Sequence, residues 1–221
     1  MADDSGIGQR RASARDTGNP LYLERRRELI HAAAKVFKAR GLSGTKIADI
    51  TAAADTDRST LYYYFSSKEE LFQEVVRDAV VANLVEARAI YAADRSAIDK
   101  LRALMTSLIS SYERHYPIIY VFIQENLSHQ PGKRTEWAND MRKVNKEYET
   151  ILVQLIQDGY DSGEMTEAGP AWLTAYGIMG MMGWTNRWFD PATSAANAAE
   201  IATTFANMTI QGLSSNTDRP T

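Results

Sequence analysis

Polar and basic side chains share one face of a short segment near residue 60, and their types suit contact with DNA. Leu61 and Phe65 recur at i and i+4, so they define the apolar side of a helix. A guanidinium can donate two parallel hydrogen bonds to guanine, and hydroxyls and phenols can reach phosphates or base edges. This chemistry is non-covalent recognition of a groove. The outward side chains are Arg58, Ser59, Tyr62 and Tyr63.

Two further patterns must position that face. Ile47, Ile50 and Ala54 fall at i, i+3 and i+7, which predicts a short helix before it. The cluster Asp55-Thr56-Asp57 predicts a turn, and Asp57 is suited to N-cap the following helix. Ser67 to Glu70 then reads S-x-x-E, a capping box that opens a third helix. The segment from Thr45 to Leu71 therefore predicts a helix-turn-helix, a fold that enters the major groove.

The same segment resembles the DNA-binding head of the TetR family of bacterial transcriptional repressors. The matching residues are Thr45, Ile50, the run T-L-Y-Y-Y-F at 60–65, and Lys68. Asp55 and Thr56 depart from the Gly and Val that the family usually has, but Asp tolerates the left-handed backbone of a tight turn. Ala48 occupies a position that can carry a base-reading Arg, so sequence readout is expected to depend on the second helix of the motif.

The resemblance implies a set of DNA contacts. We expect Thr45 to cap the first helix of the motif and, with Lys46, to hold a phosphate. Arg58 is expected to contact a base, most plausibly guanine, and Ser59 and Thr60 to reach bases or thymine methyls. Phosphate contacts that fix register are expected from the remaining residues. The full DNA-binding set is Thr45, Lys46, Arg58, Ser59, Thr60, Tyr62, Tyr63, Tyr64 and Lys68.

Charge is distributed unevenly along the chain of 221 residues. The net charge is −3, yet residues 1–68 carry +4 and residues 69–221 carry −7. A basic head on an acidic body fits a DNA-binding module with a separate regulatory domain, although drift along the chain would look the same.

Several function classes are excluded or disfavoured. Cysteine is absent, which excludes disulfides and thiolate chemistry and fits a reducing cytoplasm. The 3 histidines are scattered, and no P-loop, nucleophile elbow or dinucleotide motif appears. We therefore expect no enzyme activity, no metal site and no cofactor. The sequence has no secretory signal and no apolar run long enough to span a membrane, so a cytoplasmic protein is expected.

Helical periodicity and breakers predict an all-α protein. The expected domains are a basic tail at 1–19, disordered in solution or lying along DNA, a DNA-binding head at 20–68, a ligand-binding and dimerisation body at 69–215, and a disordered tail at 216–221. Within the head, a first helix is expected from Leu21 to Arg40, stopped by Gly41. The body is expected to hold helices at about 68–92, 95–115, 117–130, 134–162, 170–189 and 195–213.

Aromatic and Met side chains are dense in the second half of the chain. Such residues usually form core, but they also line apolar ligand cavities. Gly177, Gly180 and Gly183 interrupt one helix every third residue and make room for another helix or a ligand. Arg187 beside two Trp residues is suited to an anionic group or a flat ring. The candidate ligand-binding residues are Tyr116, Tyr120, Trp137, Trp172, Tyr176, Met179, Trp184, Arg187 and Trp188.

In the TetR family the last two long helices form the dimer interface, so the resemblance implies a homodimer through 170–189 and 195–213; an ordinary intramolecular bundle is the alternative. A dimer also places two recognition helices one DNA turn apart, as a palindromic operator requires.

The function expected is a repressor released from DNA by a small molecule. The resemblance extends to members that control lipid and steroid catabolism and answer to acyl-CoA thioesters. The alternatives are a multidrug sensor that controls an efflux pump, with Glu125 as an acid for cationic ligands, and a helical ligand-binding protein without DNA binding.

Overall fold

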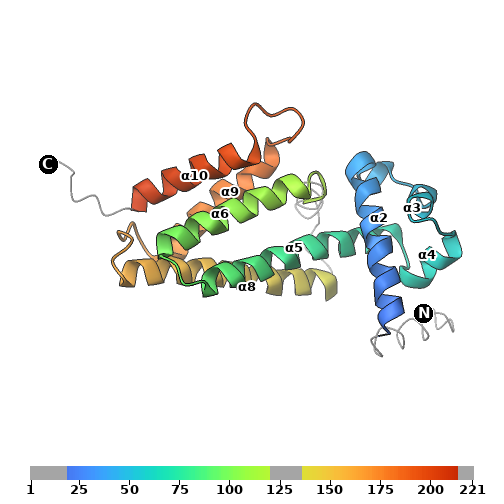
Figure 1. Cartoon of the computed structure of the whole chain (residues 1–221), viewed down its shortest axis with the longest axis horizontal. Helices are drawn as coiled ribbons and strands as arrows, with labels where there is room; N and C mark the ends of the chain where they lie inside the picture. The colour runs from blue at the N-terminus through green and yellow to red at the C-terminus, as the bar shows by residue number, and fades with distance from the viewer. Residues whose placement is uncertain (1–18, 120–135, 214–221) are drawn as a thin grey trace. The chain divides into compact units, whose positions relative to one another are not determined.

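The computed structural model describes residues 19–119 and 136–213, and these ranges fold into helices joined by turns (Figure 1). The all-α class predicted from the sequence is confirmed. The chain divides into two compact units, Met1–Asp78 and Ala79–Thr221, which we call the head and the body. None of the helices in the described ranges is long and apolar enough to cross a membrane.

The first described helix forms the back of the head. α2 spans Pro20–Gly44, and the side chain of Asn19 accepts hydrogen bonds from the amides of Leu21 and Tyr22 at its start. Gly41 leaves the helical conformation with φ of 68°, a value that suits a residue without a Cβ. The stop that the sequence predicts at Gly41 is therefore seen as a kink in the last turns of α2.

The helix-turn-helix forms as the apolar spacing predicts. α3 spans Ile47–Ala53 and α4 spans Arg58–Tyr64. Ile50, Leu61 and Phe65 are at most 1% exposed and fix both short helices against the head core. Asp55 in the intervening turn has φ of 46°, the left-handed conformation that the sequence requires of this residue.

α5 spans Lys68–Ala92, and its start shows one of the two hydrogen bonds of the predicted capping box. The hydroxyl of Ser67 accepts from the amide of Glu70 at 3.0 Å, as predicted. The carboxylate of Glu70 accepts from the amide and hydroxyl of Ser66 rather than from Ser67. The first turns of α5 bury Leu71 and Phe72 within the head, and the division between the units falls after Asp78 rather than after residue 68.

Over the described residues, the body is built from the second part of α5 and four further helices. They are α6 (Ala97–Arg114), α8 (Glu136–Asp161), α9 (Ala171–Trp184) and α10 (Ala198–Leu213), with the 3-10 turn η1 (Thr185–Arg187) after α9. α10 packs mainly along α6, and α8 packs along α9 (Figure 1). Leu101, Ile109, Leu155 and Ile156 are at most 1% exposed at the centre of this bundle.

The helix predicted at 170–189 ends earlier than expected. α9 stops at Trp184, and the amides of Trp188 and Phe189 both donate to the carbonyl of Thr185 in a tighter turn.

Some predictions fall outside the described residues. They concern the tail at 1–19 apart from Asn19, most of the helix expected at 117–130 including Tyr120 and Glu125, and the tail at 216–221.

Candidate DNA-binding face and effector pocket

One side of the helix-turn-helix presents polar and basic side chains to solvent. Arg58 and Ser59 are exposed in the first turn of α4, and Tyr62 is 45% exposed one turn later. Lys46 is exposed directly before α3, and Ala48 is exposed within it. Thr60 is half-buried. These residues form an exposed polar surface of the head with cations at two of its positions, where the sequence predicts DNA contacts.

Asp57 organises the start of this surface. Its carboxylate accepts from the hydroxyl of Ser59 at 2.6 Å and from the amide of Thr60 at 2.7 Å, which confirms the predicted N-cap. The hydrogen bond from Ser59 and the amide of Thr60 hold the pKa of Asp57 below its ordinary value. A carboxylate at a helix N-terminus also stabilises α4 through the helix dipole. The first turn of α4 is thus fixed by contacts within the protein itself.

The role predicted for Thr45 is wrong. Thr45 is only 2% exposed, and its hydroxyl donates to the carbonyl of Gly41 at 2.6 Å. Its amide donates to the carbonyl of Leu42, so it terminates α2 instead of opening α3. The N-cap of α3 is Lys46, whose amide donates to the side chain of Asp49 at 2.9 Å. Thr45 has neither a hydroxyl nor an amide free for a phosphate.

Two of the predicted phenols are packed inside the head surface. The ring of Tyr64 stacks on Tyr22 of α2 at 4.8 Å, and the ring of Tyr63 meets Tyr22 edge-on at 6.0 Å. Burial raises the pKa of Tyr64, with a smaller contribution from Tyr63. Both side chains are half-buried, so Tyr62 is the phenol of α4 most open to solvent.

Lys68 is also held by the protein. Its ammonium donates to the carbonyls of Leu42 at 2.8 Å and Thr45 at 3.1 Å. These bonds tie the end of α2 to the start of α5. An ammonium has three donors, so one N–H remains for a phosphate.

A cavity of about 290 Å³ opens within the body between α5, α6, α8 and α9. Its apolar walls continue into a narrow space lined by Leu104, Met105 and Met182. Among the described residues of the lining, Glu149 is the only charged side chain, and it pairs with Lys146 at 3.1 Å. The lining residues are Val80, Asn83, Leu108, Tyr112, Ile119, Val144, Asn145, Tyr148, Glu149 and Met179.

Two phenols give this cavity much of its character. Burial raises the pKa of Tyr112 to about 12, and a hydrogen bond with Asn186 opposes that shift. Burial also raises the pKa of Tyr148. Both phenols are therefore neutral at physiological pH and can donate a hydrogen bond to a carbonyl or hydroxyl of a ligand.

Most of the predicted ligand residues do not line this cavity; Met179 does. Trp172, Tyr176, Trp184 and Trp188 are 43–61% exposed, and Arg187 is exposed with its guanidinium 5.2 Å from the Trp184 ring. The predicted grouping of Arg187 with Trp184 is confirmed, but it lies at the surface. Tyr116 and Trp137 are half-buried and lie outside the lining.

The lining of this cavity is not predictable from the sequence, because it comes mainly from four helices with few distinctive residues on each. Asn83 on α5 and Asn145 on α8 supply amides to the lining. A polar residue on the partly buried side of an otherwise amphipathic helix is a signal that could have found Asn83, whereas Asn145 is exposed and gives no such signal.

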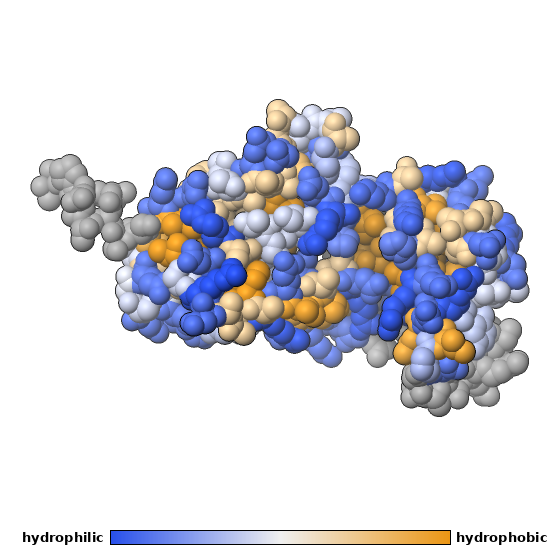
Figure 2. Space-filling model, viewed as in Figure 1, coloured by the Kyte–Doolittle hydropathy of each residue, from blue (hydrophilic) through white to orange (hydrophobic). Residues whose placement is uncertain are grey.

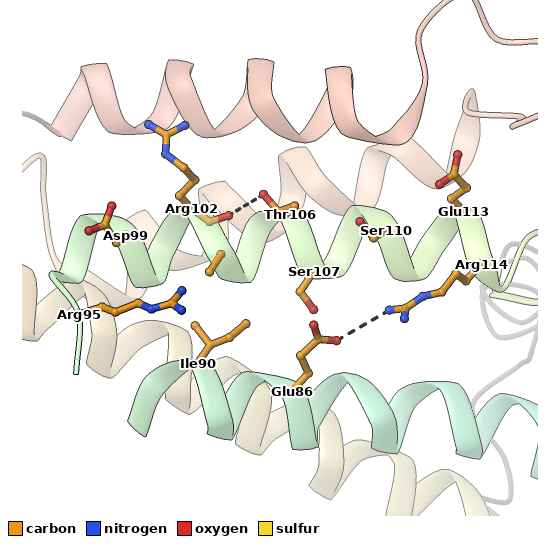
Figure 3. A pocket seen from close by; sticks show the side chains of 11 residues that line it. Glu86, Ile90, Arg95, Asp99, Arg102, Thr106, Ser107, Ser110, Glu113 and Arg114 are labelled. Atoms are coloured by element: carbon orange, nitrogen blue, oxygen red, sulfur yellow. Dashed lines mark hydrogen bonds and ion pairs between the residues drawn. The ribbon is translucent and has the colours of Figure 1, made fainter. Parts of the chain in front are cut away.

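A larger open groove, of about 980 Å³, runs between α5 and α6 (Figure 3). Its charges are balanced and its cations do not converge. Arg114 pairs with Glu86 at 3.8 Å, and Arg102 points toward α10, where it donates to Asn207. Arg95 lies near Ile90 of α5, away from the other two arginines (Figure 3). The three arginines of the groove therefore do not gather around one point.

α9 carries an apolar stripe on its outer side. Trp172, Leu173, Tyr176 and Trp184 are each 43–61% exposed, and the helix contains no charged residue. A Cβ built on Gly177 or Gly180 meets no atom within 4 Å, so these glycines face open space. On the face of the molecule shown in Figure 2, by contrast, hydrophilic residues interrupt the apolar patches.

Two family models match the chain. The model described as bacterial regulatory proteins, tetR family, matches residues 29–75. The model described as tetracyclin repressor-like, C-terminal domain, matches residues 94–213. The matches cover the helix-turn-helix and most of the body.

Relatives and solved structures agree with the family models. The HTH-type transcriptional repressor KstR2 of Mycobacterium tuberculosis is 30% identical over 139 residues, which cover 62% of this chain and 68% of KstR2. The structure of the ketosteroid transcriptional regulator KstR2 of Mycobacterium tuberculosis gives a TM-score of 0.69 at 24% identity, covering 87% of this chain and 96% of that one. AibR, solved with isovaleryl coenzyme A and operator DNA, gives 0.67 at 20% identity, covering 83% and 97%. The two structures share the fold of this chain.

Proposed function

The chain belongs to the TetR family of DNA-binding transcriptional repressors, and from this premise we propose that it binds a palindromic operator as a homodimer and leaves it when a small molecule enters the body. The observation that carries the proposal is the exposed polar and basic surface of α4, with its first turn fixed by Asp57. Since operator DNA lies in the bacterial cytoplasm, the protein acts there.

Arg58 is the principal base contact in this proposal. Its exposure at the start of the recognition helix supports a bidentate contact with guanine. Ser59 and Thr60 reach neighbouring bases, and Lys46 and Tyr62 hold phosphates that set the register. Lys68 adds one N–H to a phosphate. Tyr63 and Tyr64 act mainly through their packing on Tyr22.

Dimerisation uses the outer stripe of α9 together with the exposed side of α10. Large apolar side chains that are about half exposed on an uncharged helix favour burial against a partner. The open glycines Gly177 and Gly180 allow a second helix to approach closely. Met208 of α10, 60% exposed, extends the apolar surface. A dimer also supplies the two heads that a palindrome requires.

The effector binds the cavity between α5, α6, α8 and α9. Its apolar walls suit an acyl chain or a sterol skeleton, and Asn83, Asn145 and Tyr112 offer hydrogen bonds to carbonyl or hydroxyl groups. An acyl-CoA thioester of lipid or steroid catabolism meets this description if its acyl part enters and its anionic carrier stays outside. Lys146, which pairs with Glu149 of the lining, offers a cation to that carrier. KstR2 and AibR support this effector class.

A cationic effector, as in a multidrug sensor that controls an efflux pump, is the second candidate. The observation that favours it is Glu149, a charged residue in a lining that is otherwise uncharged over the part of the chain that the structure describes. Its pairing with Lys146 weakens the case, because a cationic ligand would have to displace the ammonium.

Release follows from a shift between two populations. Val80 and Asn83 line the cavity and belong to α5, the helix that continues back to Lys68 in the head. An effector that binds the DNA-free arrangement of α5 more tightly than the DNA-bound one lowers operator affinity. At saturation the decrease equals the ratio of the effector's affinities for the two arrangements.

The test is selection of fragments of the source genome by the purified protein, with and without added acyl-CoA thioesters. Recovery of a palindrome that acyl-CoA abolishes supports both the repressor and its effector class, and the genes beside it identify the pathway. A palindrome that responds to cationic dyes instead supports the second candidate. Absence of any enriched sequence at low salt contradicts operator binding itself.

A further inference from the structure

We propose that Arg25 and Arg26, neighbours on α2, are positioning residues that hold the two ends of the recognition helix, and that neither contacts DNA. This inference rests on the proposed reading of DNA by α4. Three consecutive arginines near the start of α2 look like phosphate ligands by charge alone. Their contacts differ, however, and of the three only Arg27 is exposed, whereas Arg25 and Arg26 are partly buried.

Arg25 holds the turn before the recognition helix. One nitrogen of its guanidinium donates to the carbonyls of Ala54 at 3.3 Å and Asp55 at 3.5 Å. The other terminal nitrogen pairs with Glu28 at 2.6 Å, which keeps the guanidinium in place. Asp55 has a positive φ, a conformation that L side chains rarely adopt. The guanidinium thus binds the backbone where the turn is most strained, three residues before Arg58.

Arg26 holds the other end. Its guanidinium lies over the ring of Phe65 at 5.0 Å, and Phe65 is the residue that terminates α4. The same side chain is only 16% exposed and pairs with Glu74 of α5 at 2.6 Å. Tyr22, one turn earlier on the same face of α2, stacks on Tyr64 in the last turn of α4. The end of the recognition helix is therefore fixed to α2 and to α5.

These contacts predict a distinct effect on DNA binding. A lost phosphate contact weakens binding to all sequences and lowers the salt dependence by about one unit. A recognition helix that loses its positioning makes poorer base contacts while the phosphate contacts remain. The ratio of operator affinity to non-specific affinity then falls, and the salt dependence stays the same.

The experiment compares Arg25→Gln with Arg27→Gln, which removes the same charge from a neighbouring exposed site. Affinities are measured for the selected operator and for a random duplex over a series of salt concentrations. For Arg25→Gln we expect the specificity ratio to fall roughly tenfold with an unchanged salt slope. For Arg27→Gln we expect an unchanged ratio. Asp55→Gly in the Arg25→Gln background should restore the ratio, because glycine adopts the positive φ without help.

Arg26 needs a paired variant, since its removal alone takes away the nearer of the two cations that pair with the buried Glu74, leaves only Arg77 at 3.8 Å, and could unfold the head. Arg26→Met with Glu74→Leu replaces both charges by apolar side chains. We expect this protein to fold, as judged by circular dichroism, and to show the same fall in specificity ratio.

Two results would overturn the inference. One is a salt slope that drops by about one for Arg25→Gln with the ratio intact, which identifies a phosphate contact. The other is an Arg26→Met/Glu74→Leu protein that keeps the full ratio. A wild-type protein without any operator preference would instead count against the proposed function.

Discussion

The head and the body hold their functional residues in different ways. In the head, side chains close together in sequence fix one another, as Asp57 fixes Ser59 and Thr60. In the body, the cavity is assembled from α5, α6, α8 and α9. Its polar residues Asn83, Tyr112 and Asn145 come from three different helices and lie far apart in the sequence. A local device can be recognised from a short motif, whereas an assembled one depends on how helices pack. The difference also predicts that the two units respond differently to the same kind of change.

The largest effect is expected from truncating a core leucine in each unit. Leu61 and Leu101 are at most 1% exposed, so replacing either by Ala should cost about 2–5 kcal/mol of unfolding free energy. All 4 Trp residues lie in the body, so Trp fluorescence during denaturation reports the body alone. Leu61→Ala should abolish operator binding and leave that transition in place, and Leu101→Ala should shift it. An equal shift for both variants would contradict independent units.

A smaller effect is expected from filling the open side of α9. Gly180→Leu meets no atom of its own protomer near the new Cβ, so the fold should be retained. At a closely packed dimer interface the added side chain costs about 1–3 kcal/mol, which raises the dimer dissociation constant about 5- to 150-fold. Sedimentation analysis measures this constant. Ala89→Leu, on an exposed position of α5, is the control, and equal behaviour of the two variants would exclude α9 from the interface.

Alkaline pH should lower the stability of the body, and acidic pH should lower the stability of the head. Burial raises the pKa of Tyr112 from 10.0 to about 12, so this phenol contributes stability to the body below pH 10 that is lost as pH rises toward 12. The lowered pKa of Asp57 has the opposite sign. It contributes stability to the head above 3.8 that is lost as pH falls. Unfolding followed by Trp fluorescence should show the alkaline loss in the body, and Tyr112→Phe should reduce it. An unchanged alkaline loss in Tyr112→Phe would remove this phenol as its cause.

The smallest effect is expected from a matched pair of helix caps. The hydroxyls of Ser67 in the head and Ser96 in the body each accept from a backbone amide at 3.0 Å. Replacing either by Ala should cost about 1 kcal/mol in its own unit. Thermal denaturation of the head, followed by operator binding, should respond to Ser67→Ala only, and Trp fluorescence to Ser96→Ala only. A response of both signals to either variant would show that the units unfold together.

The sequence predicted the head well because its signals are local. Asp57 as a cap, Asp55 as a left-handed turn residue and Gly41 as a helix stop each depend on neighbours within four residues. Thr45 was misassigned because its hydroxyl binds backward to Gly41 rather than forward into α3. That choice depends on the kink in α2, which residue types alone do not specify.

In the body the helices were predictable and the cavity was not. The spacing of apolar residues located α5, α6, α8 and α10 closely, but it could not tell which aromatic side chains face inward. Trp172 and Trp184 look like cavity residues by type, yet they lie on the outer stripe of α9. α9 is apolar all round, so its sequence contains no period that separates an inner from an outer face. Tyr112 and Asn83 line the cavity because of how the helices pack, and nothing in the residue types around them distinguishes them from other polar residues of their helices.

The most direct test of DNA reading by the head is the affinity of Arg58→Ala for a set of operators, each altered at one symmetric pair of base pairs. Wild-type protein measured on the same set is the reference. If Arg58 contacts a base, wild-type discrimination of about 1–3 kcal/mol at one position should vanish in the variant, and discrimination elsewhere should remain. Loss of affinity spread equally over all positions would contradict base reading by Arg58.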